Sequence, residues 1–286
     1  MLKVYEIPAK TILNKSDLAD FSLNCYCGCS HKCLYCYGRY MKKFKHYPQN
    51  WGDFVEVKIN APQVLAKEIQ KIKPLKKVVF MSSICDGWQP LEAKYQLSRA
   101  CLKILLENGW EVSILTKSSL IQRDFDLLGA YKTPNLACSS MQVGSLGMTI
   151  TTLNTRLKNL LEPYASSPQE RLDTLRKAQE KGIKIWVFLG PLIPEFTDTL
   201  DNLKAIFQAL AGLNLEEIYV DRLNLRWQVL ESLKRGLGRQ EYLKTKILLY
   251  KCLQPEKYRQ YSQELKEKAY QLAQKTGLVN QLKFCF

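Results

Sequence analysis

The chain has 286 residues, of which 46% are hydrophobic and 24% are charged, a composition that excludes a disordered or collagen-like protein. Lys and Arg outnumber Asp and Glu by 42 to 27, and the net charge of +15 favours anionic partners such as nucleic acid or an acidic protein. The longest apolar stretch, residues 185–194, is about half of a membrane span, and the N-terminus has no apolar signal segment. We therefore expect a cytoplasmic protein without membrane association.

Short apolar, β-branched runs alternate with helical patterns along most of the chain. The predicted strands cover residues 20–23, 77–82, 111–116, 146–152, 183–189 and 217–220. The predicted helices cover residues 62–73, 91–107, 120–131, 168–181 and 197–210. Ser167 is expected to cap the helix that starts at Pro168. This alternation predicts an α/β fold with parallel strands, a partial (β/α)6 TIM-type barrel.

The pattern becomes helical and basic towards the C-terminus. Residues 221–286 contain 14 Lys and Arg against 6 Asp and Glu. We predict a core barrel over residues 1–225 and a basic helical extension over residues 226–286 that packs on it. Ligands of such folds bind at the carboxyl ends of the strands, so the residues that follow each strand are the candidates for chemistry.

The cysteines are concentrated after the first predicted strand, where five of the ten lie within residues 25–36. Because no signal segment is predicted, these thiols indicate a metal site or redox chemistry and not a disulfide framework. Cys29, Cys33 and Cys36 are spaced Cys-x3-Cys-x2-Cys. Three thiolates of this kind can bind three irons of a cubane [4Fe–4S] cluster and leave the fourth iron for a substrate or cofactor.

A zinc site is the alternative interpretation of this segment, with Cys25, Cys27 or His31 as the fourth ligand. Zinc knuckles and ribbons usually have a second Cys/His pair a dozen or more residues further on, and the sequence has no such pair. Cys25 and Cys27 are interpreted first as packing residues, with spare ligands or a second site as the other options.

The cysteine loop, with Tyr35 before its third cysteine and a predicted barrel after it, resembles the radical SAM superfamily. The wider run 28–39, GCSHKCLYCYGR, is similar to the branch that contains spore photoproduct lyase-like and DNA repair photolyase-like proteins. Further stretches resemble the same branch in order, namely residues 82–92, 116–128, 161–163, 167–172 and 190–194. Cys85 stands where relatives usually have Thr, and spore photoproduct lyase uses a cysteine near this point as a hydrogen-atom donor. Cys85 is therefore the candidate catalytic residue.

The resemblance implies that Cys29, Cys33 and Cys36 hold a [4Fe–4S] cluster whose fourth iron binds S-adenosylmethionine (SAM). One electron from a flavodoxin- or ferredoxin-like donor would cleave SAM to a 5′-deoxyadenosyl radical, which abstracts hydrogen from a substrate. The implied SAM contacts are Ser82, Ser83 and Asp86 for the ammonium, Lys117 and Arg171 for the carboxylate, Thr149 and Thr151 for the ribose, the backbone at Leu192 for adenine, and Tyr35 beside the cluster.

Each of these contacts also has a structural alternative. The serines could cap a turn, Lys117 could be solvated, and the two threonines could be ordinary strand residues. Arg171 could instead pair with Glu170 or Asp173 on its own helix.

The substrate is left open by the sequence. Residues 35–47 interleave aromatic and cationic side chains, which could stack on bases and contact phosphates or could form an amphipathic helix. The first hypothesis is a lyase-like radical SAM enzyme that acts on nucleic acid by lesion repair or base modification. The second is the same chemistry on a peptide or small metabolite. The third is a zinc-stabilised nucleic-acid-binding protein without catalysis.

Overall fold

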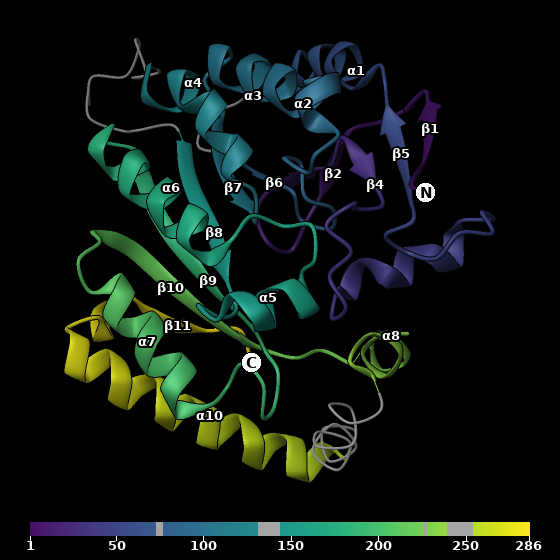
Figure 1. Ribbon diagram of the computed structural model, residues 1–286. Coiled ribbons are helices and arrows are strands. Elements are labelled where there is room, and N and C mark those ends of the chain that lie inside the picture. The colour runs from purple at the N-terminus through teal and green to yellow at the C-terminus, as the bar shows by residue number, and fades with distance from the viewer. Residues whose placement is uncertain (73–76, 131–143, 226–227, 239–253) are drawn as a thin grey trace.

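A computed structural model describes residues 1–72, 77–130, 144–225, 228–238 and 254–286. Its main sheet has the strand order β11-β10-β9-β8-β7-β6-β3-β2. The six central strands are parallel and curve into an open barrel with helices on the outside (Figure 1). They are β3 (Phe21–Leu23), β6 (Val78–Met81), β7 (Glu111–Thr116), β8 (Gly144–Ile150), β9 (Lys184–Leu192) and β10 (Leu215–Arg222). The predicted partial (β/α)6 barrel is therefore confirmed.

The helices that cover the sheet form where apolar residues recur at helical spacing. They are α1 (Ala61–Ile69), α3 (Leu97–Glu107), α4 (Phe125–Ala130), α6 (Pro168–Glu180) and α7 (Leu200–Leu210). Ser167 caps α6 as predicted, in a capping box with Glu170. The core lies between these helices and the sheet, and β9 is buried along almost its whole length because both of its faces are covered.

Two predicted helices differ from the structure. The helix predicted over residues 91–107 is interrupted at Gln96, whose φ of 53° separates α2 (Glu92–Tyr95) from α3. The helix predicted over residues 120–131 begins as the 3-10 helix η2 (Ser119–Asp124) before α4. Residue 131 and the end of the helix predicted over residues 62–73 lie outside the described residues. A further helix, α5 (Thr155–Leu161), was not predicted.

A second, three-stranded sheet that was not predicted lies beside the first predicted βα unit. Its order is β1 (Lys3–Ile7), β5 (Phe54–Lys58) and β4 (Tyr26–Cys27). Strand β4 is followed by Gly28, whose φ is 96° and whose absent Cβ would lie 2.3 Å from the carbonyl oxygen of Phe54. Only glycine fits this position, which directs the chain from β4 into the cysteine loop.

The C-terminal part, for which a helical pattern was predicted without helix bounds, contains α8 (Val229–Gly236) and α10 (Pro255–Thr276), the latter beside α7 (Figure 1). After the short η3 (Val279–Gln281) it adds the unpredicted strand β11 (Leu282–Phe284), parallel to β10. At the other edge, β2 (Leu13–Lys15) pairs antiparallel with β3. The division of the chain after residue 225 stays a prediction. Of the helices that the structure describes, none has the length and apolar character to cross a membrane.

Candidate active site

The cysteine loop runs from β4 to the 3-10 helix η1 (Tyr37–Phe44) and folds back on itself. The backbone amide of Cys36 donates to the carbonyl oxygen of Cys33 at 3.3 Å, and Cys29 and Cys33 are both buried. Burial raises the pKa of the Cys29 thiol, and repulsion from Asp86 and from the other two thiols raises it further. The three thiols are thus close enough to influence one another, and a positively charged metal core is what would stabilise them as thiolates.

A site for a single metal ion and a site for a cubane cluster require different arrangements of their ligands. Within the described ranges, no three or more Cys, His, Asp or Glu side chains are arranged to hold one metal ion. In a [4Fe–4S] cubane each thiolate binds its own iron. A buried loop that offers three mutually influencing thiols therefore fits the cluster that its spacing predicts.

Gln89 fixes the cysteine loop on both sides of Cys29. Its side-chain oxygen accepts from the amide of Ser30 at 2.8 Å, and its Nε2 donates to the carbonyl oxygen of Gly28 at 3.2 Å. Gln89 is fully buried in the loop that follows β6. The end of β6 thus sets the position of Cys29 relative to the barrel.

Helix α8 covers the other side of the cysteine loop. A Cβ on Gly236 would lie 2.4 Å from the side chain of Leu34, so the helix backbone contacts that side chain directly. A separate apolar cluster joins this helix to the loop and to the ends of the strands. Its buried members are Cys33, Tyr35, Leu161, Ile193, Leu223, Val229, Leu233 and Leu237.

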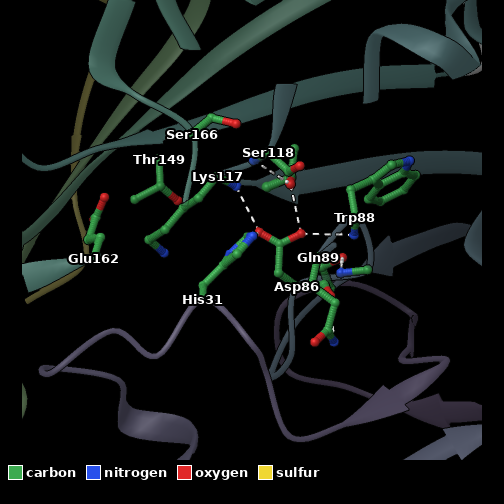
Figure 2. Close-up of polar contacts among 12 residues, drawn as sticks. His31, Asp86, Trp88, Gln89, Lys117, Ser118, Thr149, Glu162 and Ser166 are labelled. Carbon is green, nitrogen blue, oxygen red and sulfur yellow. Dashed lines mark hydrogen bonds and ion pairs between the residues drawn. The ribbon is translucent and has the colours of Figure 1, made fainter. Parts of the chain in front are cut away.

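Asp86 connects the loop after β6 to the end of β7, as Figure 2 shows. Its Oδ1 accepts from the Thr116 hydroxyl at 2.7 Å and the Trp88 amide at 2.9 Å, and its Oδ2 accepts from the Lys117 amide at 2.8 Å. The Nδ1 of His31 lies 3.4 Å from Oδ2. Both carboxylate oxygens thus have protein partners, so Asp86 orients Lys117 and the cysteine loop whether or not it also contacts the SAM ammonium.

His31 is buried inside the cysteine loop and faces Asp86. Burial lowers the pKa of His31 to about 4 although Asp86 acts in the opposite direction. The imidazole is therefore neutral at pH 7, and its contact with Asp86 is polar and not a full ion pair.

Glu162, which follows α5, is the centre of a second buried group at the end of β8. Its carboxylate accepts from the phenol of Tyr35, from the hydroxyl of Thr151 at 2.9 Å and from the guanidinium of Arg171. Burial would raise the pKa of Glu162, but the charges of Arg171 and Lys117 outweigh it and lower the pKa to about 2. Glu162 is thus ionised and ties the cysteine loop to β8 and α6.

Each nitrogen of the Arg171 guanidinium donates a hydrogen bond within this group. Besides Glu162, its guanidinium donates to the carbonyl oxygens of Thr149 and Ser166, each at 3.0 Å. Glu170 instead closes the capping box, and Asp173 pairs with Arg176 at 2.7 Å. The alternative in which Arg171 pairs on its own helix surface is therefore wrong, because its buried guanidinium pairs with Glu162.

Lys117 stands at the end of β7 with its ammonium 5.8 Å from the centre of the Tyr35 ring. No carboxylate of the described residues lies within 4 Å of that ammonium. Burial lowers the pKa of Lys117, but Cys33 and the Glu162 carboxylate act in the opposite direction and leave the pKa raised. The site therefore holds a cation that can bind a ligand anion.

The remaining predicted SAM contacts lie at the same ends of the strands. The Ser82 hydroxyl accepts from the Gly87 amide at 2.7 Å, and the Ser83 hydroxyl accepts from the Asn24 side chain at 2.8 Å. Both serines thus stabilise the turn after β6, as the structural alternative expected. Leu192 is buried at the end of β9, where its carbonyl oxygen accepts from the Leu223 amide at 3.0 Å.

The other thiols of this region form two buried pairs. The sulfur of Cys25 lies 3.7 Å from that of Cys101, and Cys27 shares a hydrogen bond with Cys85. The Cys85 sulfur also accepts from the amide of Gly28 at 3.3 Å, one residue before the first cysteine of the loop. Cys25 and Cys27 belong to the hydrophobic core, which favours the packing interpretation.

Three residues that organise the site, His31, Gln89 and Glu162, received no role in SAM binding from the sequence. Each occurs in a stretch that resembles the family. That resemblance is the one signal that could have found them, because their partners lie far away in the sequence.

Comparison with known proteins agrees with this geometry. Residues 23–210 match the Radical SAM superfamily. The uncharacterized protein MJ0683 of Methanocaldococcus jannaschii is 36% identical over 199 residues, which are 69% of this chain and 70% of that protein. The uncharacterized protein ORF301 of Acidianus two-tailed virus is 30% identical over 229 residues, or 76% and 72% of the two chains.

Two solved structures show a similar fold. Spore photoproduct lyase complexed with dinucleoside spore photoproduct is 14% identical with a TM-score of 0.70, and the match covers 99% of this chain and 82% of that one. A double mutant of that lyase with bound AdoMet and dinucleoside spore photoproduct is 15% identical, also with a TM-score of 0.70, over 100% and 82% of the chains. At this identity, the likeness shows the fold.

The chain therefore belongs to the radical SAM superfamily. It is an enzyme whose cofactors are a [4Fe–4S] cluster and SAM, and which requires an electron donor. This result sets aside the third hypothesis, a zinc-stabilised binding protein without catalysis.

Proposed function

We propose that this radical SAM enzyme acts on nucleic acid, by repair of a lesion or modification of a base, with Cys29, Cys33 and Cys36 as the ligands of its cluster. When bound and reduced, the cluster supplies the electron that cleaves SAM, whose adenosyl fragment then abstracts hydrogen from the substrate. The residues of the chain bind SAM, orient it and exclude water.

The observation that carries the choice of substrate is a group of exposed aromatic and cationic side chains around the cysteine loop. Tyr164 is 58% exposed, its amide donates to the carbonyl oxygen of His31 at 3.4 Å, and the ammonium of Lys32 lies 5.4 Å from its ring. An exposed ring with a cation beside it is suited to stack on a base and to contact the neighbouring phosphate.

The helix that follows the cysteine loop adds two further rings. Tyr37 is 38% exposed and stacks on Tyr40 with 6.5 Å between ring centres, and Phe44 is 67% exposed. The Tyr37 phenol donates to the backbone carbonyl oxygen of Ser83, so its ring lies beside the loop that follows β6. Together with the net charge of +15, these rings favour a polyanion with aromatic bases over a neutral metabolite.

We assign the SAM carboxylate to Lys117, whose ammonium has no carboxylate partner among the described residues. Asp86 holds the backbone of Lys117, and Glu162 and Arg171 hold the end of β8, where Thr149 lies. The side chains of Asp86, Glu162 and Arg171 already have protein partners, so we assign them a positioning role. The direct contact with the SAM carboxylate is assigned to Lys117.

We propose Cys85 as the thiol that returns a hydrogen atom to the substrate radical. The pKa of Cys85 is raised by its hydrogen bond with Cys27 and by burial, which keeps the thiol protonated at pH 7. A protonated thiol has the hydrogen atom that this step requires. The neighbouring Cys27 thiol could donate a hydrogen atom by the same chemistry. The Cys85→Ala variant is therefore compared with Cys27→Ala.

The basic surface has a second proposed partner, an acidic electron donor of the flavodoxin or ferredoxin class. Such a donor binds a positively charged protein through complementary potentials. The eight cysteines of the described residues are all free thiols, which supports a reducing, cytoplasmic location for this pairing.

The experiment that tests the choice of substrate is a binding titration of cluster-loaded protein with labelled single-stranded DNA, duplex DNA and RNA at several salt concentrations. We expect binding that weakens as salt rises. Tyr164→Ala should weaken it about 5- to 100-fold, since base stacking contributes about 1–3 kcal/mol. Tyr270→Ala, which removes an exposed ring from α10, is the matched control. Undetectable binding at low salt, with turnover of a peptide or metabolite instead, would establish the second hypothesis.

A further inference from the structure

Arg39, on η1, is buried beside the cysteine loop with an incomplete set of partners. Its side chain is only 6% exposed. The guanidinium donates to the carbonyl oxygen of Cys33 at 3.0 Å and to that of Trp51 at 3.5 Å, the limit for a hydrogen bond. Its Nε has no acceptor in the part of the chain that the structure describes. A permanently charged group thus lies out of water with two neutral acceptors.

Such a charge is costly unless an anion offsets it. Removing an ion from water costs several kcal/mol even after relaxation, and buried charges are normally paired. No described carboxylate lies within 4 Å of Arg39. The nearby Asp53 pairs with Lys32 at 2.6 Å, and the nearby Arg235 has the same sign as Arg39.

The groups that can supply the missing negative charge are the thiols of the loop. The Arg39 guanidinium donates to the backbone of Cys33, and Arg39 follows Cys36 by three residues in the chain. The loop also wraps around this residue. The Arg39 amide donates to the carbonyl oxygen of Cys36 at 3.4 Å, and a Cβ on the preceding Gly38 would lie 3.4 Å from the Cys36 sulfur.

We propose that Arg39 is a positioning residue that supplies the buried counter-charge of the cluster and thereby raises its reduction potential. This inference rests on the assignment of Cys29, Cys33 and Cys36 as the cluster ligands. Reduction takes one electron from the donor and adds one negative charge to the cluster. A fixed positive charge nearby stabilises the reduced form more than the oxidised form, and burial limits the screening of that charge by water.

The test is a redox titration of the cluster, monitored by electron paramagnetic resonance, with dithionite as the reductant. At a fixed potential, Arg39→Gln should lower the ratio of reduced to oxidised cluster about tenfold, which corresponds to a shift of about 59 mV to more negative potential. Arg39→Lys keeps the charge and should keep the potential of the parent. Arg235→Gln removes an exposed charge from α8 and should shift the potential much less.

Thermal unfolding of the cluster-free and the cluster-loaded protein is the second measurement. It separates the effect of the Arg39 charge from the effect of its hydrogen bonds to the loop. In the cluster-free protein Arg39 lacks its counter-ion, so Arg39→Gln should be at least as stable to heat as the parent. In the cluster-loaded protein the same variant should be less stable than the parent. A purely structural role predicts a loss in both forms.

The outcomes distinguish this inference from the proposed function. If the parent binds no cluster, the assignment of the ligands fails. If the parent binds a cluster and Arg39→Gln has the parent potential, or if Arg39→Lys shifts as far as Arg39→Gln, only the role of Arg39 is wrong. If Arg39→Gln assembles no cluster, the heat stabilities of the cluster-free parent and the cluster-free variant are compared instead. A cluster-free Arg39→Gln that is less stable than the cluster-free parent overturns the inference.

Discussion

Arg171 and Glu162 form an ion pair that is almost completely buried where β8 meets α6. The pair extends to Tyr35, whose phenol donates to the same carboxylate and which stands directly before the last cysteine of the loop. One buried anion therefore connects the barrel to the cysteine loop. The stability of the protein and the geometry of its candidate active site consequently depend on the same contact.

Removal of the Glu162 charge should destabilise the protein. We expect Glu162→Gln to lose about 3–5 kcal/mol of unfolding free energy, because it leaves Arg171 buried without its anion. Chemical unfolding of the anaerobic protein measures this loss. Asp173→Asn breaks the exposed pair with Arg176 and should cost less than about 1 kcal/mol. Equal losses of unfolding free energy in the two variants would show that the buried pair contributes no more to stability than the exposed pair.

Lys117→Met should weaken SAM binding without loss of the cluster. A hydrogen bond to a charged group contributes about 1.5–3 kcal/mol, so we expect roughly 10- to 150-fold weaker binding by calorimetry on the cluster-loaded protein. The comparison is Lys177→Met on α6, whose ammonium contacts Gln122 at 3.1 Å on the surface. Unchanged affinity in Lys117→Met would remove this residue from the SAM site.

Asp221, at the end of β10, should make stability depend on pH. Burial raises the pKa of its carboxyl group from 3.8 to about 6. Between these values the folded state binds more protons than the unfolded state, so stability falls as pH rises through this range and the penalty stays complete above about pH 6. We expect Asp221→Asn to be up to about 3 kcal/mol more stable than the parent at pH 7.5, because a shift of about two pKa units corresponds to about 1.4 kcal/mol for each unit. The difference should disappear near pH 4.

That pH dependence is checked by denaturant midpoints of parent and variant between pH 4 and pH 8. A difference that grows towards low pH would have the wrong sign for a raised carboxyl pKa and would contradict the account of Asp221.

The six central strands of the main sheet could be predicted because each is an apolar run with turn signals on both sides. The small sheet could not, since β4 is only two residues long, and the edge strand β2 of the main sheet, with three residues, was missed for the same reason. Strand β11 is similarly short, and its pairing with β10 joins residues more than sixty positions apart. The break at Gln96 depends on a left-handed backbone conformation that helix propensity does not reveal.

The candidate site also contains residues that the sequence could predict and residues that it could not. Spacing alone predicted Cys29, Cys33 and Cys36 as the ligands, because three ligands of one cluster can be supplied by one loop. For Arg171, the structural alternative named Glu170 and Asp173 because helical spacing offers them, whereas the fold brings Glu162 from the preceding loop to its guanidinium. The burial of Arg39 likewise depends on contacts that local sequence does not show.

The most direct test of the central claim is the formation of 5′-deoxyadenosine from SAM and dithionite by the anaerobically reconstituted protein, with iron and sulfide counted in the same samples. We predict product from the parent and from Cys101→Ala, whose thiol contacts Cys25 in the core. Cys29→Ala, Cys33→Ala and Cys36→Ala should each form none. Product from the triple variant, or a parent that binds no iron and sulfide, would contradict the account.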